Sequence, residues 1–288
     1  MLVRTLACGV CSGDVFAYEN RGELAAAHSR LSHEASGVVA GVGQDVTAFA
    51  EGDIVTALSM PAYADYFVAT PDQLCALPPE IDPSYALGEP IACCVHAGNR
   101  FGTVPGDRVV VVGCGFMGLV CLQIARYRGA GFICALDPDT SRLGTSRELG
   151  ADVAHSPSVN GAQSILARYG EFDLVIEAAG TQSALDLCGD LVKEHGRIVL
   201  VGYHQSQDGM RTVNMQQWNY KAIDVVNGHV RRAVEKAQAM RQGMDLMREG
   251  HLSTSPLVTT YDLSDIEQAF RDLASRKPGL LKAVLLMA

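Results

Sequence analysis

The segment DRVVVVGCGFMGLVCLQIARYRGAGFICALD, residues 107–137, constrains the fold more than any other part of this chain. Its run of four valines is typical of a strand that is buried on both faces of a parallel sheet. Residues 116–129 then place apolar side chains at helical spacing, and residues 131–137 form a second strand-like run. A strand, a helix and a second strand in this order predict a β-α-β unit.

Three later runs repeat this pattern, because residues 172–180, 196–202 and 222–228 each end an apolar stretch in glycine or a polar turn. Strands that alternate with helices predict an α/β fold with a doubly wound parallel sheet. Residues 1–90 differ, since short β-prone runs separated by Gly, Pro and Asp indicate a β-rich region. These runs lie at residues 35–43, 52–58 and 64–70.

The last part of the chain is predicted to hold two helices and one strand. An amphipathic charged helix covers about 231–249, a second begins near Ser264, and KAVLLM forms an apolar strand at 282–287. We interpret the basic residues of the first helix as a solvated face. These residues are Arg231, Arg232, Lys236, Arg241 and Arg248.

The glycines of GCGFMG follow the valine strand and open a helix, which is the context of a dinucleotide-binding turn. Glycine allows the tight turn, the close approach of a pyrophosphate and the packing of helix on strand, and helix amides receive the phosphate charge. Asp137 closes the next strand, where its carboxylate would accept hydrogen bonds from ribose hydroxyls. The same carboxylate would repel a 2′-phosphate, so NAD is expected rather than NADP. The expected cofactor contacts are Gly113, Gly115, Phe116, Met117, Gly118, Asp137, Arg142, Ala179, Gly180 and Gly202.

Composition excludes several classes of partner. The net charge of −9 and the pI of about 5.3 argue against nucleic acid or an anionic membrane as the main partner. We find no apolar run near the roughly 18 residues needed to cross a bilayer and no secretion signal. Nine irregularly spaced cysteines in such a chain indicate reduced thiols and a cytoplasmic location.

Possible metal donors gather in three segments. Cys8 and Cys11 form a Cys-x-x-Cys pair, His33 and Glu34 are adjacent, and GEPIACCVHAG supplies Glu89, Cys93, Cys94 and His96. Thiolate, imidazole and carboxylate together are the donors of catalytic zinc sites. The Cys-x-x-Cys pair could also be a redox dithiol, but that requires both thiols at a helix N-terminus. The surrounding sequence is predicted to be strand and loop, so we interpret this spacing as coincidental.

The order of the motifs resembles that of the medium-chain dehydrogenase/reductase superfamily, in its zinc-dependent alcohol and polyol (sorbitol-like) dehydrogenase branch. The motifs are CGVCSGD, SHEASGVVAGVG, GDIV, EPIACCVHA, VVVVGCGFMG, EAAG and RIVLVG, and they span nearly the whole chain. The resemblance implies a β-rich GroES-like catalytic domain at 1–91 plus 229–288, with a Rossmann NAD-binding domain inserted at 92–228. It also implies that the chain starts well inside the first domain, with the usual first strands absent.

The resemblance further implies one catalytic zinc and no second, structural zinc. Cys11 and His33 match ligands, and either Glu34 or Glu89 would be the third, while Asp14 would orient the site. Hydride would pass between a secondary alcohol or polyol and NAD, with zinc as the Lewis acid. The residues expected to take part are Cys11, Ser12, His33, Glu34, Glu89 and His229.

The chain departs from the family in its proton route. Gly13 stands where a hydroxyl is usual, with Ser12 beside it, and Phe16 replaces the histidine that often completes the relay. We hypothesise that His204, His229 or Glu34 takes this role.

Two other functions remain open. One is a zinc-free NADPH-dependent quinone or enoyl reductase of the same superfamily, and the other is a dinucleotide-binding sensor or partner subunit without turnover. The expected partners are a small alcohol, polyol or ketone and further copies of the chain in a homodimer or homotetramer, with neither nucleic acid nor membrane.

Overall fold

The computed structural model describes residues 1–19, 31–58, 61–157 and 161–287. The chain divides into two compact units, of which the first joins Met1–Ala92 to Arg232–Ala288 and the second is Cys93–Arg231. We call them the split unit and the continuous unit. Among the described residues, no helix has the length and apolar character that crossing a membrane requires.

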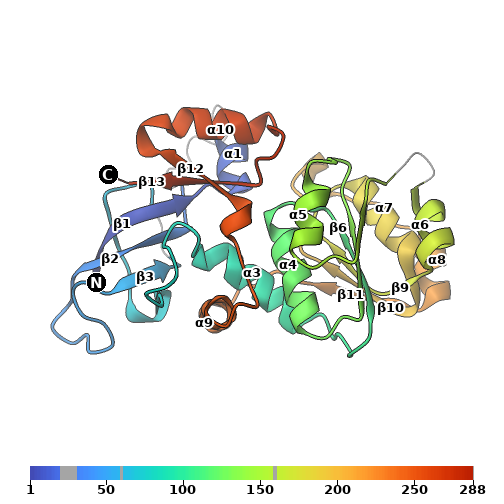
Figure 1. The fold of residues 1–288 in the computed structure, drawn as a ribbon, viewed down its shortest axis with the longest axis horizontal. Helices are drawn as coiled ribbons and strands as arrows, with labels where there is room; N and C mark the ends of the chain where they lie inside the picture. The colour runs from blue at the N-terminus through green and yellow to red at the C-terminus, as the bar shows by residue number, and fades with distance from the viewer. Residues whose placement is uncertain (20–30, 59–60, 158–160, 288) are drawn as a thin grey trace. The chain divides into compact units, whose positions relative to one another are not determined.

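The continuous unit is built on a six-stranded sheet in the order β11-β10-β9-β6-β7-β8, and every neighbouring pair is parallel. Its strands are β6 (Arg108–Val112), β7 (Phe132–Leu136), β8 (Val153–His155), β9 (Phe172–Glu177), β10 (Val192–Leu200) and β11 (Asp224–Asn227). Its helices are α4 (Phe116–Tyr127), α5 (Arg142–Glu148), α6 (Gly161–Tyr169), α7 (Gln182–Leu191) and α8 (Met215–Lys221). Figure 1 shows α4 and α5 on one side of this sheet and α6 and α7 on the other, which confirms the doubly wound fold.

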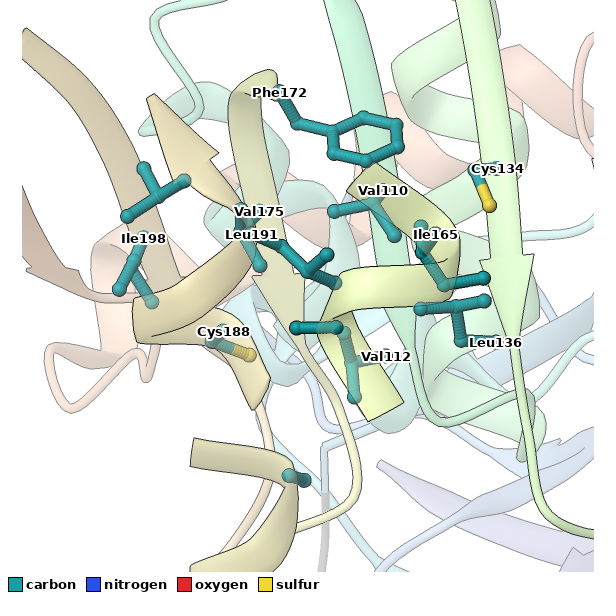
Figure 2. Close-up of a cluster of buried hydrophobic side chains, with 13 residues drawn as sticks. Val110, Val112, Cys134, Leu136, Ile165, Phe172, Val175, Cys188, Leu191 and Ile198 are labelled. Carbon is teal, nitrogen blue, oxygen red and sulfur yellow. The ribbon is translucent and has the colours of Figure 1, made fainter. Parts of the chain in front are cut away.

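The core of this unit explains why the valine run is continuous. Val110 and Val112 pack with α6 and α7 in one apolar cluster, which Figure 2 shows together with Phe172, Leu191 and Ile198. The alternate residues Val109 and Val111 are also fully buried, because α4 contacts β6, β7 and β9. Burial on both faces leaves no position for a polar side chain.

The split unit is built on a seven-stranded sheet in the order β12-β13-β1-β2-β3-β5, with β4 paired to β1. Its strands are β1 (Leu2–Gly9), β2 (Ala35–Gly41), β3 (Ile54–Ala57), β4 (Tyr66–Val68), β5 (Leu74–Ala76), β12 (Val258–Asp262) and β13 (Lys282–Leu286). β1 pairs antiparallel with β13, with Ala7 opposite Leu286. Residues from the two ends of the sequence therefore lie side by side in one sheet.

Helices complete the split unit. They are α1 (Ser12–Glu19), α9 (Ala233–Arg248) and α10 (Ile266–Ala274), and α3 (Gly88–Asn99) begins in this unit and contains the boundary between the two. Figure 1 shows α1 next to α10, where Tyr18 and Phe270 meet edge to face with ring centroids 5.3 Å apart.

The loop expected after Cys11 is wrong, because α1 begins at Ser12. Few residues of this segment indicate a helix in the sequence. Its apolar side is instead stabilised by packing, because Val15 and Tyr18 join the cluster of α10 and β13.

Candidate functional site

Three of the predicted metal donors converge in the split unit. One ligand atom each of Cys11, His33 and Glu34 lies within 4.8 Å of the others. Cys11 follows β1, and the other two residues immediately precede β2. β1 and β2 are antiparallel neighbours with Cys8 opposite Ala35, so their pairing brings the donors together.

Asp14 fixes the backbone on both sides of this group. Its Oδ2 accepts a hydrogen bond from the amide of Cys11 at 3.2 Å, and its Oδ1 accepts one from the amide of Ser32 at 3.2 Å. Tyr63 donates its hydroxyl to the same carboxylate at 2.9 Å. Asp14 is buried, and it therefore ties the Cys11 turn to the segment that carries His33 through charge-assisted bonds.

Glu34 is almost completely buried, with 1% of its surface exposed, and it forms an ion pair with Lys282 of β13. Burial raises the pKa of Glu34, and the Lys282 ammonium opposes that effect. Gly9 makes the room for this pair, because a Cβ there would lie 2.1 Å from Oε2 of Glu34 and 3.1 Å from Cε of Lys282. Any side chain at position 9 would therefore displace the carboxylate.

Glu89 lies next to this group, at the start of α3, and its two carboxylate oxygens face different partners. Oε2 is 3.8 Å from Nε2 of His33, and Oε1 is 2.5 Å from Nζ of Lys236. The expectation that Lys236 lies on a solvated helix face is wrong, since only 25% of its side chain is exposed.

The surroundings of His33 test whether a metal fits. Burial lowers its pKa, but the hydrogen bond to Cys11 and the charge of Glu89 outweigh burial and raise the pKa to about 9. The ring thus sits among anionic donors that favour a positive charge at this point. Sulfur, imidazole and carboxylate donors that converge within 4.8 Å are the donor set of a catalytic zinc ion, so the residues fit that metal.

Cys8 does not join the donor group. Its Sγ contacts Oγ of Ser32 at 2.6 Å, and its side chain is fully buried. Burial raises the pKa of Cys8 to about 12, which keeps the thiol protonated and unreactive. Cys8 lies in β1 and not at a helix N-terminus, so the Cys-x-x-Cys pair lacks the geometry of a redox dithiol.

The glycines of the second motif lie in the continuous unit, between β6 and α4, and two of them are required by close contacts. Gly113 has a φ of +101°, and a Cβ on Gly118 would lie 1.9 Å from the carbonyl oxygen of Gly113. Around Gly115 a Cβ would meet no atom within 4 Å. This turn is therefore tight against the sheet and open at its middle, as a pyrophosphate-binding turn requires.

Asp137 follows β7, is 3% exposed, and helps to shape the turn. Its Oδ2 accepts a hydrogen bond from the amide of Cys114 at 2.7 Å, and its Oδ1 accepts one from the amide of Asp139. Arg142 lies 3.4 Å from Oδ2. Phe116 is buried, so near the turn it presents its backbone and not its ring, and Met117 contacts Cys94 through sulfur at 3.6 Å.

The carboxyl ends of β9 and β10 are joined by a residue that the sequence analysis did not single out. Glu177 is fully buried, and its Oε1 accepts hydrogen bonds from the amides of Ala179 and Gly180 at 3.0 and 2.7 Å. Its Oε2 is 3.1 Å from Nε2 of His204. A Cβ on Gly202 would lie 2.3 Å from the amide nitrogen of Gly180, so the two strand ends are in tight contact.

A cavity of about 370 Å³ opens at these strand ends. His229 donates from Nε2 to the carbonyl of Gly202 at 3.3 Å, and burial together with the Arg231 guanidinium lowers its pKa. The cavity is lined by Leu200, Gly202, Tyr203, His204, Asn227, His229 and Arg231.

The structure thus brings the predicted residues into two sites. Cys11, His33, Glu34 and Glu89 are near one another in the split unit, and Ser12 lies beside them in sequence but is exposed. The cofactor residues and both histidines, His204 and His229, belong to the continuous unit. Sequence reasoning missed Lys236, although its spacing from Met240, Gly243 and Met244 places it on the buried stripe of α9.

Comparison with known families agrees with this arrangement. The family described as "Alcohol dehydrogenase GroES-like domain" matches residues 1–148, and the family described as "Zinc-binding dehydrogenase" matches residues 117–249. A sorbitol dehydrogenase from Halalkalibacterium halodurans is 28% identical over 303 residues, which cover 93% of this chain and 86% of the relative.

Two solved structures share the fold. An alcohol dehydrogenase from Thermus sp. ATN1 has a TM-score of 0.85 at 22% identity, and the match covers 100% of this chain and 92% of the other. A candidate zinc-binding dehydrogenase from Sinorhizobium meliloti, solved with NADP bound, has a TM-score of 0.84 at 21% identity, with 99% and 91% covered. Since a GroES-like alcohol dehydrogenase family covers more than half of the sequence, the chain belongs to the zinc-type medium-chain dehydrogenase superfamily.

Proposed function

We propose that this protein is a zinc-dependent dehydrogenase that transfers hydride between a secondary alcohol of a polyol and NAD. The convergence of Cys11, His33 and Glu34 within 4.8 Å is the observation that carries the proposal. The sorbitol dehydrogenase that is 28% identical to the chain supports a polyol as the substrate. A zinc ion held by these donors would act as a Lewis acid toward the substrate hydroxyl.

The chain's own residues would do the remaining work. Asp14 and Tyr63 hold the donor segments in place, and the Gly113–Gly118 turn would receive the pyrophosphate on the first amides of α4. The carboxylate of Asp137 would accept hydrogen bonds from the hydroxyls of the adenosine ribose. Its carboxylate favours NAD, because it would repel the 2′-phosphate of NADP.

Metal content tests the proposal directly. Purified protein should contain about one zinc per chain by plasma mass spectrometry, and Cys11→Ser should lose it together with NAD-dependent polyol oxidation. Cys75→Ser is the matched control, because Cys75 is a free thiol of β5 in the same unit. A folded protein without zinc would contradict the proposal and favour a zinc-free reductase or a binding protein.

The choice of cofactor has its own test. Asp137→Ala should lower kcat/KM for NAD about 10-fold or more, since a hydrogen bond to a charged group contributes about 1.5–3 kcal/mol. Arg142, 3.4 Å from the same carboxylate, should then favour the 2′-phosphate, so kcat/KM for NADP should rise. A variant that keeps the wild-type ratio of the two constants would show that Asp137 does not select the cofactor.

His229 is half-buried with a lowered pKa, so it is a neutral base near pH 7, and we propose it as the group that takes the alcohol proton in place of the usual relay. His229→Ala should then change the pH–rate profile, whereas His204→Ala should act through Glu177 on cofactor affinity. An unchanged profile in His229→Ala would contradict this role for His229.

We also propose a homodimer or homotetramer in a reducing cytoplasm. β11 ends the sheet of the continuous unit, and three of its four residues are exposed, including Val225 at 43%. An open strand edge with apolar side chains needs cover. Light scattering should give a molar mass of more than one chain, and Val225→Lys should shift the protein toward monomer. The structure pairs none of the nine cysteines, all of which it describes, in a disulfide, which fits a reducing compartment.

A further inference from the structure

Two buried or half-buried carboxylates border the candidate metal site, and a catalytic zinc ion has room for only one of them if a position is to stay open for substrate. Each carboxylate has its own lysine: Glu34 pairs with Lys282 of β13, and Glu89 pairs with Lys236 of α9. The two pairs are not equivalent, because Glu34 belongs to the converging donor group and Glu89 lies outside it. Any part that the two lysines play in metal binding rests on the proposed zinc-dependent function.

The carboxylate of Glu89 lies between two possible partners, each of which faces one of its oxygens. Its Oε1 is 2.5 Å from Nζ of Lys236, whereas its Oε2 is 3.8 Å from Nε2 of His33, which is too long for a hydrogen bond. The side chains of Glu89 and Lys236 are only 13% and 25% exposed. A charge-assisted bond in such surroundings is short and strong, so it fixes the carboxylate next to the site.

We propose that Lys236 is a positioning residue that holds Glu89 beside His33 and out of the metal's coordination sphere. Cys11, His33 and Glu34 then remain the three protein ligands, and the fourth position stays available to substrate. Without the ammonium, the attraction that draws Oε1 toward α9 is lost and the carboxylate can turn toward the metal, since its second oxygen already faces His33 at 3.8 Å.

Lys282 cannot play the same part for Glu34. Glu34 is 1% exposed, and Gly9 of β1 and Lys282 of β13 both lie close to its carboxylate. Its carboxylate cannot swing away from the donor group without displacing β1 or β13. Lys282 therefore compensates the charge of a ligand that is fixed in place. Lys236, by contrast, restrains a carboxylate that could otherwise turn toward the metal.

The test uses full-length protein in which cobalt(II) replaces zinc, because the visible absorption of cobalt is much stronger in four-coordinate than in five- or six-coordinate sites. Lys236→Met keeps a long unbranched side chain and removes its charge. We expect weaker cobalt absorption and a metal dissociation constant about 10-fold lower than in the wild type, because a second carboxylate joins the site. The KM for polyol should rise as the open position is filled.

A second substitution and a control make the result specific. Adding Glu89→Gln to Lys236→Met should restore the wild-type spectrum and metal affinity, and Lys236→Arg should keep both. Arg232→Met removes a cation next to the start of the same helix, whose partner is the exposed Glu235, and should change neither quantity. Thermal unfolding of each variant checks that the fold is intact.

The outcomes separate the two proposals. If the wild type binds one cobalt ion and Lys236→Met has the same spectrum and affinity, Lys236 does not restrain Glu89 and only this inference fails. A change in Lys236→Met that Glu89→Gln does not reverse has the same meaning. A wild-type protein that binds no metal would overturn the zinc-dependent function, and this inference with it.

Discussion

The two sites of this protein are built from different kinds of residue. In the split unit, the site consists of ionisable side chains that are buried or half-buried, and each glutamate pairs with a lysine from a distant part of the sequence, as Glu34 does with Lys282. In the continuous unit, the turn consists of positions without side chains, where Gly113 and Gly118 let backbone meet backbone. The first is sensitive to the loss of a charge, and the second to the addition of a methyl group.

The largest effect is expected from Lys282→Met. It leaves the carboxylate of Glu34 buried without its cation, and breaking a buried ion pair by removing one partner costs about 3–5 kcal/mol. The free energy of unfolding, measured by urea with circular dichroism on metal-free protein, should fall by this amount. The loss should be smaller when zinc is bound, because the metal then supplies positive charge.

Lys277→Met is the matched control for that variant. Lys277 also pairs with a carboxylate in the split unit, that of Asp272 at 2.7 Å, but 55% of its side chain is exposed. Exposed pairs contribute about 1 kcal/mol or less. Equal losses in the two lysine variants would contradict the view that buried charge sets the stability of the split unit.

Gly118→Ala should produce the next largest effect, and in the other unit. The new methyl group would lie 1.9 Å from the carbonyl oxygen of Gly113, and overpacking of this kind costs about 1–3 kcal/mol. Fluorescence of the single tryptophan, Trp218, reports on this unit, because its ring packs against the core shown in Figure 2. Its unfolding midpoint in urea should fall.

Gly144→Ala provides the contrast within the same unit. Gly144 lies in α5, and a Cβ there would meet no atom within 4 Å. Alanine is favoured over glycine in a helix by about 0.5–1 kcal/mol, so this variant should be slightly more stable. A loss similar to that of Gly118→Ala would show that glycine matters here for some reason other than close packing.

The smallest effect is expected for the surface pair of Asp173 and Lys193. Burial works to raise the pKa of Asp173, but Lys193 and the amide of Arg108 outweigh it, so this pKa lies below its usual value. Such a group stabilises the fold above its unfolded pKa of about 3.9 and loses that contribution as pH falls through the folded pKa.

Asp173→Asn should therefore lose more stability at pH 7 than at pH 2. Since 45% of the Lys193 side chain is exposed, the loss should be at most about 1 kcal/mol. Trp218 fluorescence in urea at both pH values measures the difference. A loss that persists unchanged at pH 2 would mean that the shape of the side chain, and not its charge, is what matters.

The fold of the continuous unit could be predicted closely from the sequence. The predicted strands at 107–113 and 131–137 correspond to β6 at Arg108–Val112 and β7 at Phe132–Leu136. Local periodicity was sufficient there, because a doubly covered strand has to be apolar at every position. The helix α1 was missed, since it is stabilised by contacts with α10, more than 240 residues away.

The donor residues could be proposed from their types and order, but their roles could not. Nothing in the local sequence distinguishes Glu34 from Glu89, because both lie beside other possible ligands. The difference between them comes from Lys282 on β13 and Lys236 on α9, which only the folded chain brings near. A lysine can lie on a solvated helix face or in a buried ion pair, so residue type alone does not distinguish the two.

The pairing of β1 with β13 has a consequence for the order in which the protein is made. The continuous unit is complete once residue 231 has left the ribosome, and it can fold at that point as a contiguous domain. The split unit has to wait for residues 282–286, because β13 fills the place between β1 and β12. Lys282 arrives with that strand, so during synthesis the carboxylate of Glu34 gains its counter-charge only after β13 has been made.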